Sequence, residues 1–280
     1  MSGTASAKRL IAKLTAGVAV ALAASAAVAT LGTAAASAAT TTNWVMTGWN
    51  IQQLDSLSPA TANHFFNNAN SYATGPQATT SPVPTGFAAS GVLVYTSYAQ
   101  FASDIASHAI SPAYSWVMYD PEYWSSTPLN EQQNPALYMQ EFAQLAHANG
   151  LKVIETPGRD LGLVPGSACP MTPGENLDHW FLNCNIAAAA SSADVLVVQD
   201  QVNTLNPAEF DFLYTSAAAQ AHAANPQAVV DAEISTTYGT ATQEATAAKS
   251  AGAQGIYINA TTQDLGKTRS FLHLMQAAGY

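Results

Sequence analysis

Short apolar runs that alternate with alanine-rich segments of helical period constrain the fold of this chain more than any other feature. One run lies near the start and six follow Gly91; they cover residues 44–46, 92–95, 116–119, 151–154, 195–198, 228–232 and 255–258. Nearly continuous apolar strands separated by helices are typical of a parallel sheet whose faces are covered by helices. Because no glycine-rich nucleotide loop accompanies them, we expect an α/β fold of the closed (β/α)8 TIM-like type rather than an open doubly wound sheet. Only seven strands are evident, so a seven-stranded or irregular barrel stays open.

The expected helices begin and end with suitable local chemistry. Asn134-Pro135 places proline at a first helical position, and this helix should stop at Asn149-Gly150. Asn206-Pro207 repeats the beginning, and a third alanine-rich segment ends at Ala251-Gly252 directly before a strand. This recurrence predicts repeated βα units.

The first 38 residues have the pattern of a secretory signal peptide. Lys8, Arg9 and Lys13 precede an almost uncharged stretch, residues 14–36, and the small residues 36–38 form a cleavage site of the signal-peptidase type. The alternative is an uncleaved membrane anchor, because the stretch could span a bilayer if tilted. Its many alanines make it weakly hydrophobic, so we predict a signal peptide over 1–38, one barrel domain over 39–280, and a secreted, extracellular protein that leaves the membrane after cleavage.

The charge of the mature chain limits its partners. Loss of residues 1–38 leaves five basic residues against 18 acidic ones, a net charge of −13. The remaining lysines and arginines are scattered, so nucleic acid and anionic membrane surfaces are excluded as partners and neutral ligands are favoured. The histidines show no metal-binding spacing and a G-x-S-x-G elbow is absent, so we expect neither a metal nor a cofactor. The helices lack apolar heptads, which favours a monomer.

The two cysteines are expected to pair. Cys169 and Cys184 enclose a loop rich in proline and glycine, and in an exported chain such a pair is more often bridged than free. Two buried thiols are the alternative.

Seven of the 18 acidic residues lie at or just after four of the expected strands. If the strands are parallel, their carboxyl ends meet on one face, where barrel enzymes place their chemistry. The seven are Asp120, Glu122, Glu155, Asp160, Asp200, Asp231 and Glu233.

Each acid also has a structural interpretation. Asp120 before Pro121 could cap a turn, Glu122 could be solvated, and Asp160 could neutralise Arg159. Asp200 follows a fully apolar strand and could cap the next segment. Asp231 and Glu233 are two apart and therefore share a face of their strand; we favour the barrel interior for Glu233, because an unpaired acid facing the helices would be costly to bury.

Aromatic residues gather near the same loops. Tyr119, Tyr123 and Trp124 flank Glu122, and Trp180 falls inside the cysteine loop. Aromatic faces beside carboxylates and amides are typical of a sugar site, while core packing is the alternative.

Acids at the strand ends of a secreted barrel resemble the arrangement in barrel glycoside hydrolases. The segment Tyr119-Asp120-Pro121-Glu122-x-Trp124, with Thr127-Pro128 and Glu131-Gln132, also resembles a signature of secreted actinobacterial proteins; the chitinase pattern DxxDxDxE is absent. The resemblance implies a carbohydrate substrate and two-carboxylate chemistry, in which one acid protonates the glycosidic oxygen and a second attacks carbon or activates water.

We therefore expect Glu233 as the acid, Glu122 or Asp120 as its partner, and Glu155 in reserve for either role. The residues expected to bind substrate are Asp200, Gln201, Asp231, Arg159, Tyr119, Trp124 and Asn259. The cysteine loop would form one wall of the cleft. Two alternatives stay open: a barrel that binds glycan or cell-wall material without cleaving it, and a carboxylate lyase or metal-assisted hydrolase with Asp120, Glu155 and Asp200 as oxygen ligands.

Overall fold

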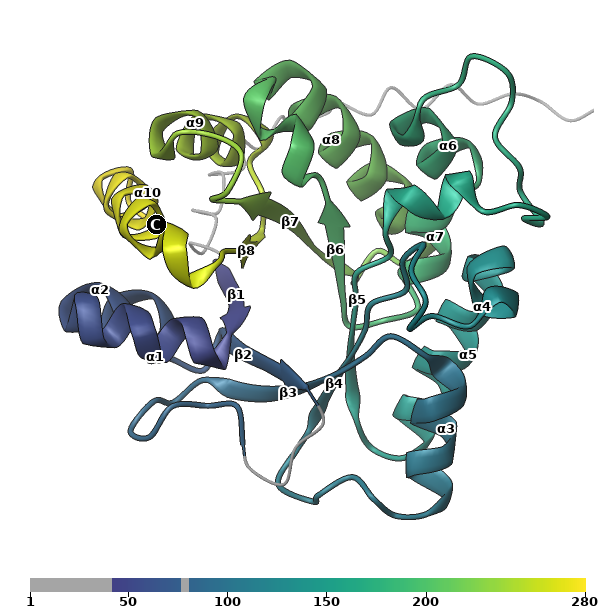
Figure 1. Ribbon diagram of the computed structural model, residues 1–280, viewed down its shortest axis with the longest axis horizontal. Helices are drawn as coiled ribbons and strands as arrows, with labels where there is room; N and C mark the ends of the chain where they lie inside the picture. The colour runs from purple at the N-terminus through teal and green to yellow at the C-terminus, as the bar shows by residue number, and fades with distance from the viewer. Residues whose placement is uncertain (1–41, 77–80) are drawn as a thin grey trace, which may run out of the picture. The chain divides into compact units, whose positions relative to one another are not determined.

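Eight parallel strands close into a barrel in the computed structural model of the chain, which describes residues 42–76 and 81–280 (Figure 1). The expected signal peptide, residues 1–38, lies outside the described residues. Each strand pairs with its neighbour in sequence, and β1 closes the barrel by pairing with β8. The strands are β1 (Asn43–Thr47), β2 (Ser71–Pro76), β3 (Ser90–Tyr95), β4 (Trp116–Tyr119), β5 (Lys152–Glu155), β6 (Val195–Gln199), β7 (Val229–Ser235) and β8 (Gly255–Asn259). The predicted TIM-like fold is confirmed.

The strand that the sequence did not reveal is β2. The seven apolar runs all form strands, whereas Ser71–Pro76 contains no apolar run and ends in Gly75 and Pro76. It lies in the region that looked least regular, which also forms α1 (Gly48–Leu57) and α2 (Pro59–Phe66). The barrel therefore has eight strands, and the seven-stranded alternative is wrong.

Helices surround the strands in the described part of the chain (Figure 1). Pro135 and Pro207 are the first residues of their helices, as predicted, and Gly252 ends a helix with a φ of 61°. Besides α1 and α2, the helices are α3 (Tyr98–Ala106), α4 (Leu129–Gln133), α5 (Pro135–Ala148), α6 (Leu177–Asn183), α7 (Ile186–Ala190), α8 (Pro207–Ala224), α9 (Ala241–Ala251) and α10 (Leu265–Ala277), with short 3-10 turns η1 (Arg159–Leu163), η2 (Gln201–Leu205) and η3 (Thr262–Asp264). Within residues 42–76 and 81–280, no helix has the length and apolar character needed to cross a bilayer.

Alternation along the strands divides the core into two layers. The barrel interior is filled by apolar side chains from six strands: Val45, Tyr72, Val92, Trp116, Met118, Ile154, Val195 and Val197. Intervening residues such as Leu93, Val117 and Leu196 face the helices in a larger apolar cluster. Above the apolar filling, the interior positions at the carboxyl ends of β6, β7 and β8 are polar, and these positions form the candidate site.

Candidate active site

The interior residues at the carboxyl ends of neighbouring strands are Gln199 on β6, Glu233 on β7 and Tyr257 on β8. Glu233 is in register with Gln199 on one side and with Tyr257 on the other. Asp120 follows β4 directly. Parallel strands thus bring groups from distant parts of the sequence to one face of the barrel, as expected for the acids of β4 and β7.

The side-chain amide of Gln199 joins two of the predicted catalytic acids. Its Nε2 lies 3.1 Å from Oδ1 of Asp120 and 3.0 Å from Oε1 of Glu122, and 2.9 Å from the carbonyl oxygen of Thr156. The two carboxyl oxygens are therefore no farther apart than about twice a hydrogen-bond length. Gln199 was not among the residues selected from the sequence, because an amide at the end of an apolar strand gives no signal beyond its position.

Glu233 is the most enclosed acid of this group. Its Oε1 accepts hydrogen bonds from Nε2 of Gln201 at 2.8 Å and from Nδ2 of Asn259 at 3.0 Å. Its Oε2 is buried and has no hydrogen-bond partner among the described residues. Burial raises the pKa of Glu233 to about 8, with a contribution from the charge of Glu122 and against the effect of the two amides. The prediction that Glu233 faces the interior is confirmed, and this carboxyl group is protonated at neutral pH.

Asp120 and Glu122 differ in how strongly their protons are held. Burial raises the pKa of Asp120 well above its ordinary value, and the neighbouring charges of Glu122 and Glu233 raise it further. The pKa of Glu122 is also raised by burial; the hydrogen bonds from Gln199 act to lower the pKa of both carboxyl groups without reversing either shift. Since like charges on adjacent carboxyl groups oppose each other, ionisation of one member of the pair disfavours ionisation of the other.

Tyr257 is the second member of the site that the sequence did not indicate. Burial raises the pKa of its phenol, and the charges of Glu233, Asp120 and Glu122 act in the same direction. The phenol therefore stays protonated and keeps a hydroxyl group beside three carboxyl groups. From the sequence alone, a tyrosine in an apolar strand indicates core packing. Only the strand register shows that Tyr257 lies next to Glu233.

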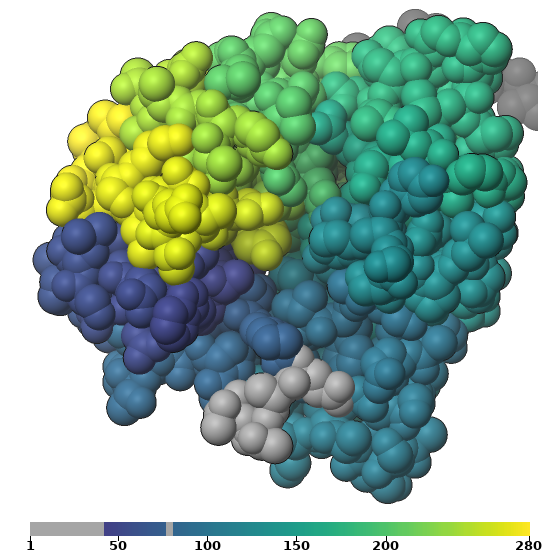
Figure 2. Space-filling view, viewed as in Figure 1, coloured from purple at the N-terminus to yellow at the C-terminus, as the bar shows by residue number. Residues whose placement is uncertain are grey.

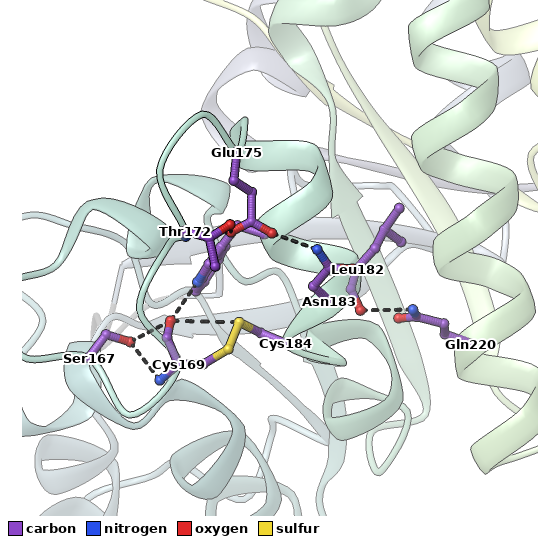
Figure 3. Close-up of a disulfide and its surroundings, with 9 residues drawn as sticks. Ser167, Cys169, Thr172, Glu175, Leu182, Asn183, Cys184 and Gln220 are labelled. Carbon is purple, nitrogen blue, oxygen red and sulfur yellow. Dashed lines mark hydrogen bonds between the residues drawn. A yellow bond between two sulfur atoms is a disulfide. The ribbon is translucent and has the colours of Figure 1, made fainter.

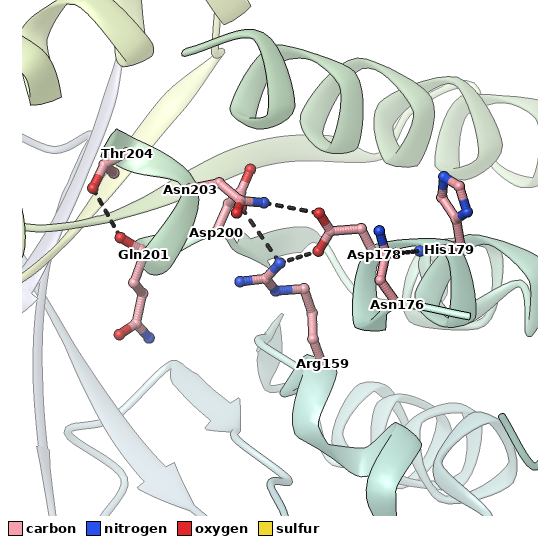
Figure 4. A network of polar contacts seen from close by, with 8 residues as sticks. All are labelled: Arg159, Asn176, Asp178, His179, Asp200, Gln201, Asn203 and Thr204. Atoms are coloured by element: carbon pink, nitrogen blue, oxygen red, sulfur yellow. Dashed lines mark hydrogen bonds and ion pairs between the residues drawn. The ribbon is translucent and has the colours of Figure 1, made fainter. Parts of the chain in front are cut away.

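Arg159 lies at the edge of this group in a network of its own (Figure 4). Its guanidinium forms an ion pair with Asp178 and lies 3.7 Å from Oδ1 of Asp200, while Asn203 donates to Asp178 at 2.8 Å. Asp160, for which neutralisation of Arg159 was one structural alternative, forms no ion pair with it and accepts from the backbone N–H of Tyr123 at 3.2 Å. The cause is α6, which carries Asp178 against η1.

Asp200 lies beneath Arg159 and has no exposed surface. Burial raises its pKa to about 8, and the guanidinium opposes this. The structure thus places Asp200 where its carboxyl group supports Arg159.

Three other predicted site residues are not brought to the mouth. Glu155 pairs in register with Tyr119 and Leu196, which face the helices, so its fully buried carboxyl group lies in the outer layer. Tyr119 donates to Glu131 at 2.8 Å in the same layer. Asp231 is interior but one layer deeper than Glu233, against Gly255. Trp124, in the loop after β4, is 41% exposed and donates to Thr127, whose hydroxyl also accepts from the backbone N–H of Glu122 at 3.3 Å.

Strand alternation explains the misplaced residues. Glu155 and Tyr119 are the last residues of their strands, whereas the interior residues of β4 and β5 are Met118 and Ile154. Sequence position identified the correct end of each strand but not the face, because both faces of these strands are apolar.

A pocket of about 200 Å³ opens beside Glu122, while Glu233 does not line it and is connected to it through the side chain of Gln201. It is lined by Glu122, Arg159, Asp160, Leu177, Gln199, Gln201 and Val202. Leu177 belongs to the loop closed by the Cys169–Cys184 disulfide, which the sequence predicted and the structure contains (Figure 3). The loop is fixed further by Trp180, whose indole N–H donates to the carbonyl of Cys169 at 2.7 Å. It supplies one wall of the pocket, as expected.

The described residues do not assemble the metal ligands of the alternative interpretation. Over residues 42–76 and 81–280, no three His, Cys, Asp or Glu side chains are grouped so that they could hold a metal ion. Glu155 faces the helices and is separated from Asp120 by the strand wall. Comparison with known protein families and with curated proteins finds no match for this chain.

Proposed function

We propose that this protein is a secreted glycoside hydrolase with Glu233 as general acid and Glu122 as its ionised partner. The observation that carries the proposal is the difference between two acids at one barrel mouth. Glu233 is buried, with a pKa of about 8, whereas Glu122 is partly exposed and lines the pocket, and the hydrogen bond from Gln199 opposes the rise in its pKa that burial causes. Environments that push neighbouring carboxyl groups apart in pKa are what acid and base roles require.

In the proposed reaction, the Glu233 carboxyl group gives its proton to the glycosidic oxygen as the bond from that oxygen to the anomeric carbon breaks. Glu122 either forms a bond to the anomeric carbon or takes a proton from the water that does so. Gln199 holds Glu122 in place, and Gln201 and Asn259 fix Glu233 through its Oε1, which leaves Oε2 to carry the proton.

Secretion belongs to the same proposal. The disulfide and the acidic mature chain support an oxidising, extracellular location, where a carbohydrate polymer is an accessible substrate.

The test is a screen of neutral polysaccharides (cellulose, xylan, mannan and β-1,3-glucan) for release of reducing ends. Glu233→Gln and Glu122→Gln should each lower the rate by about 10²- to 10⁴-fold. Glu141→Gln, on the outer helix α5, serves as the control and should keep wild-type activity.

Leaving-group chemistry separates the two roles. Glu233→Gln should recover activity on dinitrophenyl glycosides, whose leaving group needs no proton, while Glu122→Gln should not. Retention of full activity on the natural polymer by either variant would overturn the assignment.

A further inference from the structure

The pocket beside Glu122 adjoins a larger one. Its volume of about 200 Å³ lies below the range of about 300–1,000 Å³ that is usual for ligand sites. A second pocket of about 510 Å³ shares Arg159, Leu177 and Val202 with it. Figure 2 shows the surface hollowed between the green and teal segments of the chain, which supply these shared residues. A ligand bound against Glu122 in the first pocket therefore lies next to the second pocket.

The second pocket, between α6 and α8, has one apolar side and one polar side. Phe212 and Val202 are 46% and 57% exposed, although both are apolar. The ring of His179 meets that of Phe212 edge-on, with 5.7 Å between centroids, and helps to set its orientation. Asn176 and Asn203 are also part of the lining. A pyranose ring needs both kinds of surface, because its C–H face packs on apolar groups while its hydroxyls bond to amides and carboxylates.

The wall between the two pockets is built from fixed side chains. Arg159 lines both pockets, and its ion pair with Asp178 holds it in place (Figure 4). Asp178 also accepts from Asn203 at 2.8 Å. At the start of α6, Asn176 accepts from the backbone N–H of His179 at 2.8 Å. Because these groups are already ordered, a ligand here loses little binding free energy to their immobilisation.

We infer that the second pocket, defined by Leu177, Val202 and Phe212, is a subsite for at least one further sugar unit of a neutral polysaccharide chain. This rests on the proposed hydrolase activity and adds a preference for long substrates. Asp178 is paired with Arg159, and Glu209, which also lines the pocket, adds a negative charge that disfavours an acidic sugar. Phe212 is the residue that determines the preference.

The test measures binding to the inactive variant Glu233→Gln, with cello-, xylo-, manno- and laminari-oligosaccharides of two to six units as probes. In the series that the wild-type protein hydrolyses, the hexamer should bind at least tenfold more tightly than the dimer. Adding Phe212→Ala should weaken the hexamer about five- to tenfold and leave the dimer within twofold, as expected for loss of one aromatic platform. Phe212→Tyr should restore hexamer binding. Leu274→Ala, which removes a 37% exposed apolar side chain from α10, is the matched control and should change neither.

Equal affinity for dimer and hexamer in a hydrolysed series would overturn the subsite and leave the hydrolase standing. If the wild-type protein hydrolyses none of the four series and none of the four polysaccharides, the proposed function fails and the subsite fails with it. If Phe212→Ala does not fold, hydrolysis of oligosaccharides of different lengths by the wild-type protein still tests the subsite. A kcat/KM that rises at least tenfold from dimer to tetramer supports the subsite, and a flat profile overturns it.

Discussion

Replacing Glu233 by glutamine should stabilise the protein at neutral pH while it removes the proposed acid. The amide has the shape of the protonated carboxyl group, and its oxygen can accept the same two hydrogen bonds from Gln201 and Asn259. It differs in having no proton to lose. The change therefore isolates what it costs to keep an ionisable group buried at this place.

The magnitude follows from the pKa of Glu233, which is about 8 in the folded protein against an ordinary value of 4.5. Between these values the folded state holds a proton that the unfolded state has released, so stability falls as pH rises through this window. At pH 7, which is about 2.5 units above the ordinary pKa of 4.5, keeping Glu233 protonated lowers the stability of the folded state by about 3 kcal/mol. Below pH 4 both states are protonated and this cost vanishes. Glu233→Gln should thus gain about 3 kcal/mol at pH 7, or roughly 6–12 °C in Tm for a domain of this size.

Urea unfolding followed by circular dichroism at pH 4 and pH 7 measures the difference, with Glu141→Gln reporting any general effect of losing a carboxylate. The predicted quantity is the stability gained by Glu233→Gln at pH 7 minus the stability gained at pH 4. Effects of the substitution that do not depend on pH cancel in this difference. A gain of the same size at both pH values would refute the reasoning, because Glu233 would then not be held protonated by its surroundings.

Three further outcomes are expected. Gln199→Leu removes the N–H group that lowers the pKa of Glu122, so the acidic limb of the kcat/KM profile should move to higher pH and kcat should fall about 10²-fold. In Gly255→Ala the new methyl group would overlap the carboxyl group of Asp231, which should cost about 3 kcal/mol in urea unfolding, whereas Gly266→Ala on α10 meets no atom and should be neutral or slightly stabilising. Replacing both cysteines by serine should lower the free energy of unfolding by about 3 kcal/mol, because the bridge closes a loop with a sequence separation of 15.

The sequence predicted the barrel well because its strands are buried on both faces. Such strands form apolar runs, and seven of the eight could be located. The exception, β2, includes Ser71, Thr74 and Gly75, and a strand of small and polar residues lacks the pattern on which the prediction depends. Helix starts at Pro135 and Pro207 were also predictable, because proline at the first helical position acts locally.

The site was less predictable, since it depends on strand face and register. Glu233 and Glu155 are both acids at strand ends, yet one faces the interior and the other the helices. For Glu233, the companion Asp231 two positions earlier gave a reason to choose the interior. Glu155 had no such companion. Gln199 and Tyr257 became visible only through their register with Glu233, which joins strands distant in sequence.

The cost of keeping Glu233 protonated also bears on whether the barrel cleaves glycans or only binds them. A protein that only binds glycans needs a group at position 233 that accepts from the amides of Gln201 and Asn259 and that bonds to a sugar hydroxyl. A glutamine would meet both needs. It would also avoid the penalty of about 3 kcal/mol that the protonated Glu233 costs at pH 7. What a buried carboxylic acid offers beyond an amide is a transferable proton. Gln199, by contrast, is an amide at the neighbouring interior position, where it holds a carboxylate and no proton transfer is required. Asp231 and Glu155 are also buried with raised pKa values, and Glu233 differs from them in its hydrogen bond from Gln201, which lines the pocket, so it is the acid whose proton the proposed hydrolase can use.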